Sequence, residues 1–209
     1  MATCRETVSG ALRKIGRLGA GREPRAADQA DVLAALQGLY RQWINGGAFG
    51  RLSDVVPTGA AYTARENERI FRNASATVTI TLPETVATVP NPRSYRDEVL
   101  TYEGITGNTR PPRDCAVVVI SDAFTATTVE YIYDGSQRLW QAINALALAD
   151  TAPLSVRDPM GLQAALAMQI ADEFGAEVGA MTQRQAATFQ MGLTHRYSTP
   201  REASSGVFV

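Results

Sequence analysis

The order of hydrophobic periodicities along the chain limits its fold more than any other feature. Apolar residues recur with the spacing of a helix face near both ends, whereas the middle alternates with the period of a β-strand. Such helices must bury their apolar sides against another element. We expect the helices at one end of the chain to pack against those at the other end. The sequence therefore predicts an α+β protein, in which the N- and C-terminal segments form a helical bundle and a β-rich insertion projects from it.

The N-terminal part, residues 1–47, is predicted to contain two helices. The first covers residues 3–18 and the second residues 26–44. The apolar side of the first consists of Val8, Ala11, Leu12 and Ile15. The apolar side of the second consists of Val32, Leu36, Leu39, Tyr40 and Trp43. The sequence Asn-Gly-Gly at 45–47 ends the second helix, because asparagine and glycine tolerate the left-handed conformation found at helix ends.

The middle part, residues 48–134, is rich in threonine, valine and proline and is predicted to form strands. Residues 76–82 alternate polar and apolar side chains, as expected for a strand with one solvated face. Residues 115–120 form a short apolar run that suits a central strand. Residues 127–133 alternate again and lead into the turn pair Asp134-Gly135. This region is therefore expected to be the insertion.

The third part, residues 135–193, is predicted to return to helices. The first is expected over 136–148, packed on the sheet, and the second over 160–174, after the capping pair Asp158-Pro159. A third is expected over 182–193. The helical pattern stops at Thr194, so residues 194–209 are predicted to be an extended C-terminal tail.

Charge and cysteine content limit the functions open to the chain. It has 20 Lys and Arg against 21 Asp and Glu, a net charge of -1, so any contact with nucleic acid must be local. Cys4 and Cys115 do not form a disulfide framework, which favours a reducing compartment. No run approaches the roughly 20 apolar residues of a membrane span. We therefore expect a protein made in the cytoplasm that has no membrane partner.

The residue types needed for catalysis are sparse. His195 is the single histidine and lies beside the predicted tail, where a rigid catalytic arrangement is not expected. The two cysteines and one histidine do not make a zinc site. The glycines of residues 45–50 follow a helix and lack the lysine of a nucleotide-binding loop. The adjacent Asp172 and Glu173 favour a solvated face over an acid and base pair. We therefore predict no catalytic, cofactor-binding or metal-binding residues, and no enzyme.

A cluster of cations on the first helix is the candidate for contact with DNA. Arg13, Lys14 and Arg17 could face phosphate groups, although three spaced cations on a helix are more commonly its solvated side. The two tryptophans, Trp43 and Trp140, fall on apolar helix sides and are predicted to be core residues, although either could stack on a base or a sugar.

Three segments of the sequence resemble the head-to-tail adaptor family of tailed phages and related gene-transfer particles, also called tail accessory or packaged-DNA stabilisation proteins. They are the helix containing Ala-Leu-Arg-Lys-Ile-Gly at 11–16, the helix end from Leu39 to Gly47, and the proline-opened helix Pro159–Ala167. The resemblance covers about half of the chain, at its two helical ends. The β-rich insertion at 48–134 departs from compact members of the family.

The resemblance implies a structural role in the virion neck. A subunit of this family assembles, commonly as twelve copies, on the lower face of the portal ring. It extends the DNA channel and provides a platform for the next tail protein. The expected partners are therefore the portal protein, a downstream tail or neck protein, neighbouring copies of the chain, and packaged DNA through the channel alone.

The predicted tail suits attachment to another chain. Sixteen extended residues, 194–209, could reach roughly 50 Å and end in an apolar, β-prone segment. The residues expected to bind the portal or a neighbouring subunit are His195, Arg196, Tyr197, Val207, Phe208 and Val209. The alternative for this segment is a frayed terminus.

Two other functions remain open from the sequence. The β-rich region could be a binding module that recognises a carbohydrate or a tail protein, with the helices as its support. A hydrolase is the weakest candidate, since the sequence offers one histidine for acid and base chemistry.

Overall fold

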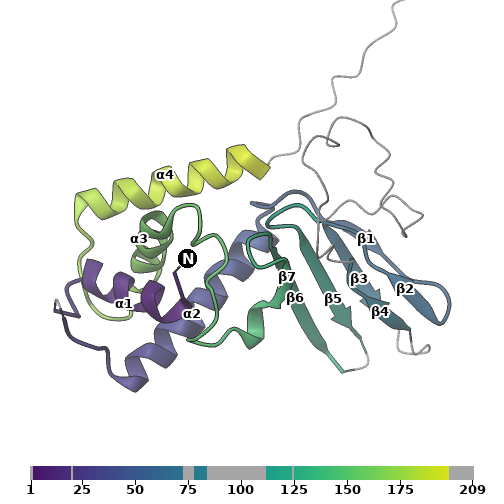
Figure 1. Ribbon diagram of the computed structural model, residues 1–209, viewed down its shortest axis with the longest axis horizontal. Coiled ribbons are helices and arrows are strands. Elements are labelled where there is room, and N and C mark those ends of the chain that lie inside the picture. The colour runs from purple at the N-terminus through teal and green to yellow at the C-terminus, as the bar shows by residue number, and fades with distance from the viewer. Residues whose placement is uncertain (1, 20, 73–77, 84–111, 124, 198–209) are drawn as a thin grey trace, which may run out of the picture.

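Figure 1 shows the computed structural model of the chain, which describes residues 2–19, 21–72, 78–83, 112–123 and 125–197. The helices lie at one end of the molecule and the strands at the other, with α2 reaching from the helical end to the sheet (Figure 1). The prediction of an α+β protein is confirmed at this level.

Four α-helices make up the helical end. They are α1 Cys4–Lys14, α2 Ala26–Asn45, α3 Pro159–Ile170 and α4 Ala180–Tyr197. Helix α1 begins in a capping box, in which the Thr3 side chain accepts from Glu6 N and the Glu6 carboxylate accepts from Thr3 N. It ends before the predicted Leu18, because Gly16 takes a φ of 73° and turns the chain.

Helix α3 lies in the middle of the helical end and contacts the other three helices. It has no charged residue, and apolar or small side chains are buried on several of its sides. Gly10 lets α1 approach it closely, since a Cβ at Gly10 would lie 2.2 Å from Cδ of Gln163. The predicted apolar sides of α1 and α2 are buried in the same core. Helices from the two ends of the chain therefore share one hydrophobic core.

A five-stranded mixed sheet forms the other end, in the order β1-β3-β5-β6-β7. Its strands are β1 Ser53–Val55, β3 Glu68–Arg72, β5 Val117–Asp122, β6 Thr127–Asp134 and β7 Leu139–Ala142. Strands β1, β3 and β5 are parallel, whereas β5, β6 and β7 are antiparallel neighbours. The predicted strands at 115–120 and 127–133 correspond to β5 and β6.

A second, two-stranded sheet covers one side of the first. It consists of the parallel strands β2 Ala61–Thr63 and β4 Thr79–Thr81, and β4 lies within the strand predicted at 76–82. Residues along β5 alternate between two cores: Val117 and Val119 join the helical core, whereas Val118 joins a small core between the sheets. The main sheet is therefore buried on both faces.

The prediction of a helix over residues 136–148 is wrong. The Asp134 carboxylate accepts hydrogen bonds from Ser136 and from the amide of Gln137 and thereby closes a turn. The chain then continues as β7 and a short 3₁₀-helix, Ile143–Ala145. The sheet therefore extends beyond the predicted limit of the insertion at Asp134, as far as Ala142.

Helix α4 is longer than predicted. It continues through Tyr197, so the expectation that the helical pattern stops at Thr194 is wrong for residues 194–197. Leu193 is buried, and the Thr194 hydroxyl donates to the carbonyl of Gln190, so the last turns have both packing and hydrogen bonds. The rest of the predicted tail, 198–209, lies outside the described residues.

Candidate interaction surface

Helix α4 lies on the outside of the helical end and is held to it along one side (Figure 1). Ala186, Phe189 and Leu193 are buried there, and the Phe189 ring lies 5.7 Å from that of Trp43. Gly161 of α3 makes this approach close, because a Cβ there would lie 2.6 Å from Cδ2 of Phe189. Phe189 therefore fixes α4 against the core.

The three cations proposed to face DNA lie at the end of α1 and just beyond it. Lys14 Nζ donates to Oε1 of Gln185 on α4 at 2.8 Å, and the Arg17 guanidinium donates to the carbonyl of Phe174. The Arg13 side chain is exposed. Two of the three therefore bind the α3–α4 region of their own chain.

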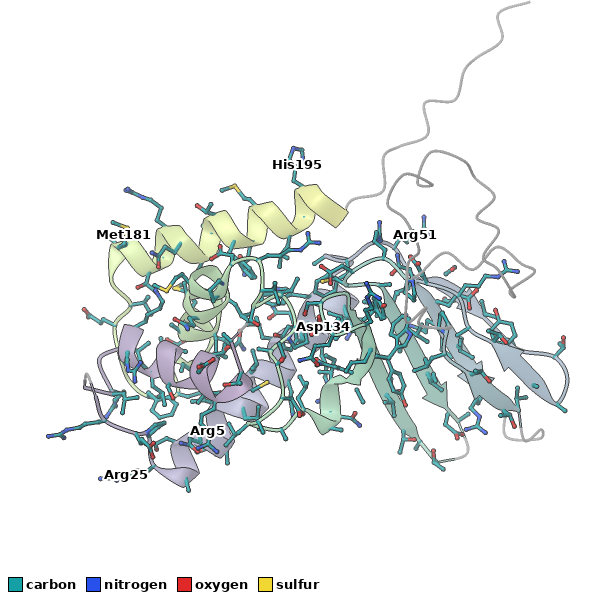
Figure 2. The ribbon with its side chains drawn as sticks, viewed as in Figure 1. Arg5, Arg25, Arg51, Asp134, Met181 and His195 are labelled. Atoms are coloured by element: carbon teal, nitrogen blue, oxygen red, sulfur yellow. The ribbon has the colours of Figure 1, made fainter. Side chains whose placement is uncertain are left out.

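The outer side of α4 is exposed and carries large apolar side chains. Met181 is 67% exposed and Met191 is 66% exposed. Figure 2 shows Met181 and His195 near opposite ends of α4, both projecting away from the helical core. A shallow, mainly apolar groove of about 780 Å³ lies on the second half of the helix. It is lined by Ala187, Gln190, Met191, Gly192, Thr194 and His195.

Helices α3 and α4 carry unusually little charge for this protein. Arg184 and Arg196 are their only fully charged residues, whereas 20% of the whole chain is charged. The four methionines of the described part, Met160, Met168, Met181 and Met191, are all exposed. Protein interfaces are depleted of charge and enriched in methionine, whose flexible side chain adapts to a partner. The outer side of α4 thus has the composition of a contact surface.

The predicted partner-binding residues fall partly on this surface. His195 is exposed and lines the groove. Arg196 and Tyr197 belong to the last turn of α4 by their backbone. Val207, Phe208 and Val209 lie outside the described residues. The predictions based on sequence missed the first half of the surface, around Met181, because an isolated methionine gives no sign of whether it is buried.

A polar pocket of about 340 Å³ lies beside β7, in the segment that was predicted to be a helix. Gln141 lines it, is buried, and donates weakly to Gln137 at 3.5 Å. Trp140, expected on a helix, lies in β7 and donates from Nε1 to the carbonyl of Pro83 at 3.0 Å. Trp43, by contrast, is a core residue as predicted.

The cysteines are buried among core residues. Burial, with the nearby charge of Asp150, raises the pKa of the Cys4 thiol to about 12. The hydroxyl of Tyr40 donates to the carbonyl of Pro153 at 2.6 Å, and burial raises its pKa well above the ordinary value. Within the described ranges, no group of three or more His, Cys, Asp or Glu residues could hold a metal ion. None of the described helices is both long and apolar enough to cross a membrane.

No protein-family model matches the sequence, and no curated protein matches it at a significant level. What the protein does must therefore be inferred from its own residues and surfaces.

Proposed function

We propose that the protein is a head-to-tail connector subunit of a tailed phage or a related gene-transfer particle, and that copies of it form a ring beneath the portal. The observation that carries this proposal is the outer side of α4, where exposed methionines and a groove lie on a helix that has no acidic residue. A surface of that kind is costly to leave in water and is typical of protein contacts.

In this proposal each part of the chain has a place in the neck. The helices form a bundle that makes the body of the ring, and the β-rich part projects from it. Residues after Tyr197 act as the tail that attaches to the portal or to a neighbouring copy. The subunit is made in the host cytoplasm and ends in the virion, where it meets packaged DNA through the channel alone.

The direct test is reconstitution with the portal protein of the same particle. We expect negative-stain images of the mixture to show a closed ring on one face of the portal, and light scattering to show a mass that corresponds to several bound copies. Failure to bind the portal and every other neck component would contradict the proposed function.

The role of the tail can be tested by a truncation that spares α4. Deleting residues 198–209 should abolish portal binding while leaving the helical circular dichroism signal unchanged, because α4 ends at Tyr197. Portal binding at the wild-type level would contradict the role of the tail and leave the ring proposal intact.

A β-type binding module is the second candidate. The observation that favours it is the small core between the two sheets, which contains Ala64, Ile70 and Val118 and gives the β-rich part packing of its own. Phe71 and Val56 are also exposed near the edge of the main sheet. A monomer that binds glycans, or a tail protein, without the portal would favour this function over the connector.

A further inference from the structure

The polar pocket beside β7 contains a buried hydrogen-bond acceptor that no described residue satisfies. Strand β7 is an edge strand of the main sheet, on the side of the helical end (Figure 1). Gln141 of β7 is 8% exposed and lines the pocket. Its Nε2 donates to Oε1 of Gln137 at 3.5 Å, whereas its own Oε1 is buried and accepts no hydrogen bond from the described part of the chain. Turning the amide over would bring its oxygen against that of Gln137, which is repulsive, so Oε1 is the unsatisfied atom.

The packing of the sheet gives no reason for an amide at position 141. Gln141 pairs with Ile132 of β6, which pairs with Val117 of β5, so the three side chains share one face of the sheet. Ile132 and Val117 are buried in the helical core, and a leucine at 141 would continue their apolar row. A buried amide oxygen without a donor destabilises the fold. Its presence at the wall of a pocket points to a ligand that donates to it.

The other wall of the pocket, residues 145–151, is fixed to the helical end by hydrogen bonds. The carbonyl of Asp150 accepts from the amide of Cys4, at the start of α1, at 2.8 Å. Gln37 of α2 donates from Nε2 to the carbonyl of Leu146 at 3.1 Å. The pocket therefore has its shape before a ligand binds, as small-molecule sites usually do.

The charge and the lining of the pocket select the kind of ligand. Among the described residues that line it, Asp150 alone is formally charged, and its carboxylate forms no ion pair within the described ranges. A positive charge beside Asp150 and an N–H donor for Gln141 are therefore favoured in the same ligand. The rest of the lining is partly apolar and includes Leu139, Ala142, Ala145, Leu146 and Ala149. These side chains can pack against a short aliphatic chain that carries the cation.

We propose that this pocket binds a small organic cation, a primary ammonium or a guanidinium group on a short aliphatic chain, which donates to Oε1 of Gln141 and lies beside the Asp150 carboxylate. The inference goes beyond the connector function and does not depend on it. A pocket of about 340 Å³ suits a group of this size. The cation can belong to a free amine or to a lysine or arginine side chain of another protein, and experiment separates these two sources.

Titration of the ¹⁵N-labelled chain with matched probes tests the ligand class. Butylammonium and butylguanidinium carry the cation, butanol is the neutral match, and butyrate is the anionic match. We expect both cations to give saturable NMR shifts of the Gln141 side-chain amide and of the β7 backbone amides. Their dissociation constants should be on the order of 1 mM, as expected for fragments of this size. Butanol and butyrate should bind at least about tenfold more weakly, because neither places a cation beside Asp150.

Substitutions test which residues hold the cation, with binding followed through the β7 backbone amides. Gln141→Leu should weaken butylammonium binding about tenfold and leave the stability equal or higher, because the unsatisfied oxygen is removed. Asp150→Asn should weaken binding by a similar factor, because the charge is lost while an oxygen remains to accept from the amide of Ala147. The matched controls make the same changes at exposed positions of α3 and α2. Gln169→Leu and Asp31→Asn should bind the cation as the wild-type chain does.

The outcomes decide this inference separately from the connector function. It is overturned by butanol or butyrate binding as tightly as the cations, by wild-type affinity in either pocket variant, or by no saturable shift up to about 50 mM of either cation. A further probe, acetylarginine methylamide, carries its guanidinium on a peptide backbone. Binding with the affinity of butylguanidinium identifies a protein side chain as the source, and exclusion of this probe identifies a free amine. Portal binding can succeed or fail without changing any of these results.

Discussion

At the scale of single residues, the close packing of α4 depends on the absence of a side chain. Gly161 lies in the first turn of α3, where the Asp158 carboxylate accepts from its amide at 2.8 Å. A Cβ at this position would lie 2.4 Å from Oδ2 of Asp158 and 2.6 Å from the Phe189 ring. Asp158, which caps α3, and Phe189, which holds α4 to the core, therefore both pack against the position where Gly161 has no side chain.

We expect Gly161→Ala to lower the free energy of unfolding by about 1–3 kcal/mol, since Phe189 or the capping Asp158 must move. The measurement is chemical denaturation. Gly38→Ala is the matched control, because Gly38 is a helical glycine with nothing within 4 Å of an added Cβ. That substitution should raise stability by up to about 1 kcal/mol through helix propensity. Equal effects of the two changes would contradict the packing role of Gly161.

At the scale of elements, the β6–β7 hairpin shows how one side chain overrides a periodic pattern. Apolar residues in 136–148 have helical spacing, but Asp134 ends β6, and its carboxylate accepts hydrogen bonds from the amides of Ser136 and Gln137 in a turn. Leu139 and Trp140 then pair with Asp134 and Tyr133 in register, and Trp140 packs on the Tyr133 ring at 5.3 Å. Residues 139–142 are more stable paired with β6 than they would be in a short helix without a packing partner.

We expect Asp134→Ala to destabilise the protein by about 1–3 kcal/mol, because the turn amides of Ser136 and Gln137 lose their acceptor. The loss should be local first. Hydrogen exchange should therefore show faster exchange of the β7 amides, Leu139–Ala142, than of those in α3. Unchanged protection of β7 would contradict the role of Asp134 in ordering the hairpin.

At the scale of the whole molecule, an ion pair joins α2 of the helical end to β6 of the sheet. Arg41 Nε of α2 lies 3.5 Å from Oε2 of Glu130 on β6, and Glu130 is 7% exposed. Burial makes the carboxylate dependent on its partner, because water cannot replace the lost charge. The pair used for comparison, Arg157 with Asp114 at 2.7 Å, is shorter, and its arginine is about as exposed as Arg41. Its carboxylate is more exposed, since the Asp114 side chain is 31% exposed and that of Glu130 is 9% exposed.

We expect Arg41→Ala to cost about 1–3 kcal/mol, since Glu130 would be left buried without its cation. Arg157→Ala should cost under about 1 kcal/mol in spite of the shorter distance, because water screens an exposed pair. Thermal and urea denaturation of the two variants gives the comparison. If Arg157→Ala lowers the free energy of unfolding more than Arg41→Ala does, burial of the carboxylate does not decide how much these ion pairs stabilise the protein.

The sequence predicted those parts of the fold that depend on local chemistry. The apolar sides of α1 and α2, from Val8 to Trp43, are buried as expected, and the Asp158 cap begins α3 as expected. Strands β5 and β6 also follow their patterns. The prediction of a helix at 136–148 was wrong because the same apolar spacing fits a buried helix and a strand followed by a 3₁₀ turn. Pairing with the neighbouring strand β6 decides between these two structures. The end of α4 was missed because the burial of Leu193 on the core, a tertiary contact, extends it.

By itself, the sequence determined where helices and strands can form, since periodicity, caps and turn residues act within a few positions of the chain. The tertiary structure alone decided which of those helices and strands pack against one another. It buried α3 between three helices, and it left Met181 and Met191 exposed on α4. Exposure is a property of the whole packed molecule, because a side chain is covered by residues that are distant in sequence. The surface that carries the proposed function therefore exists only once the chain has folded.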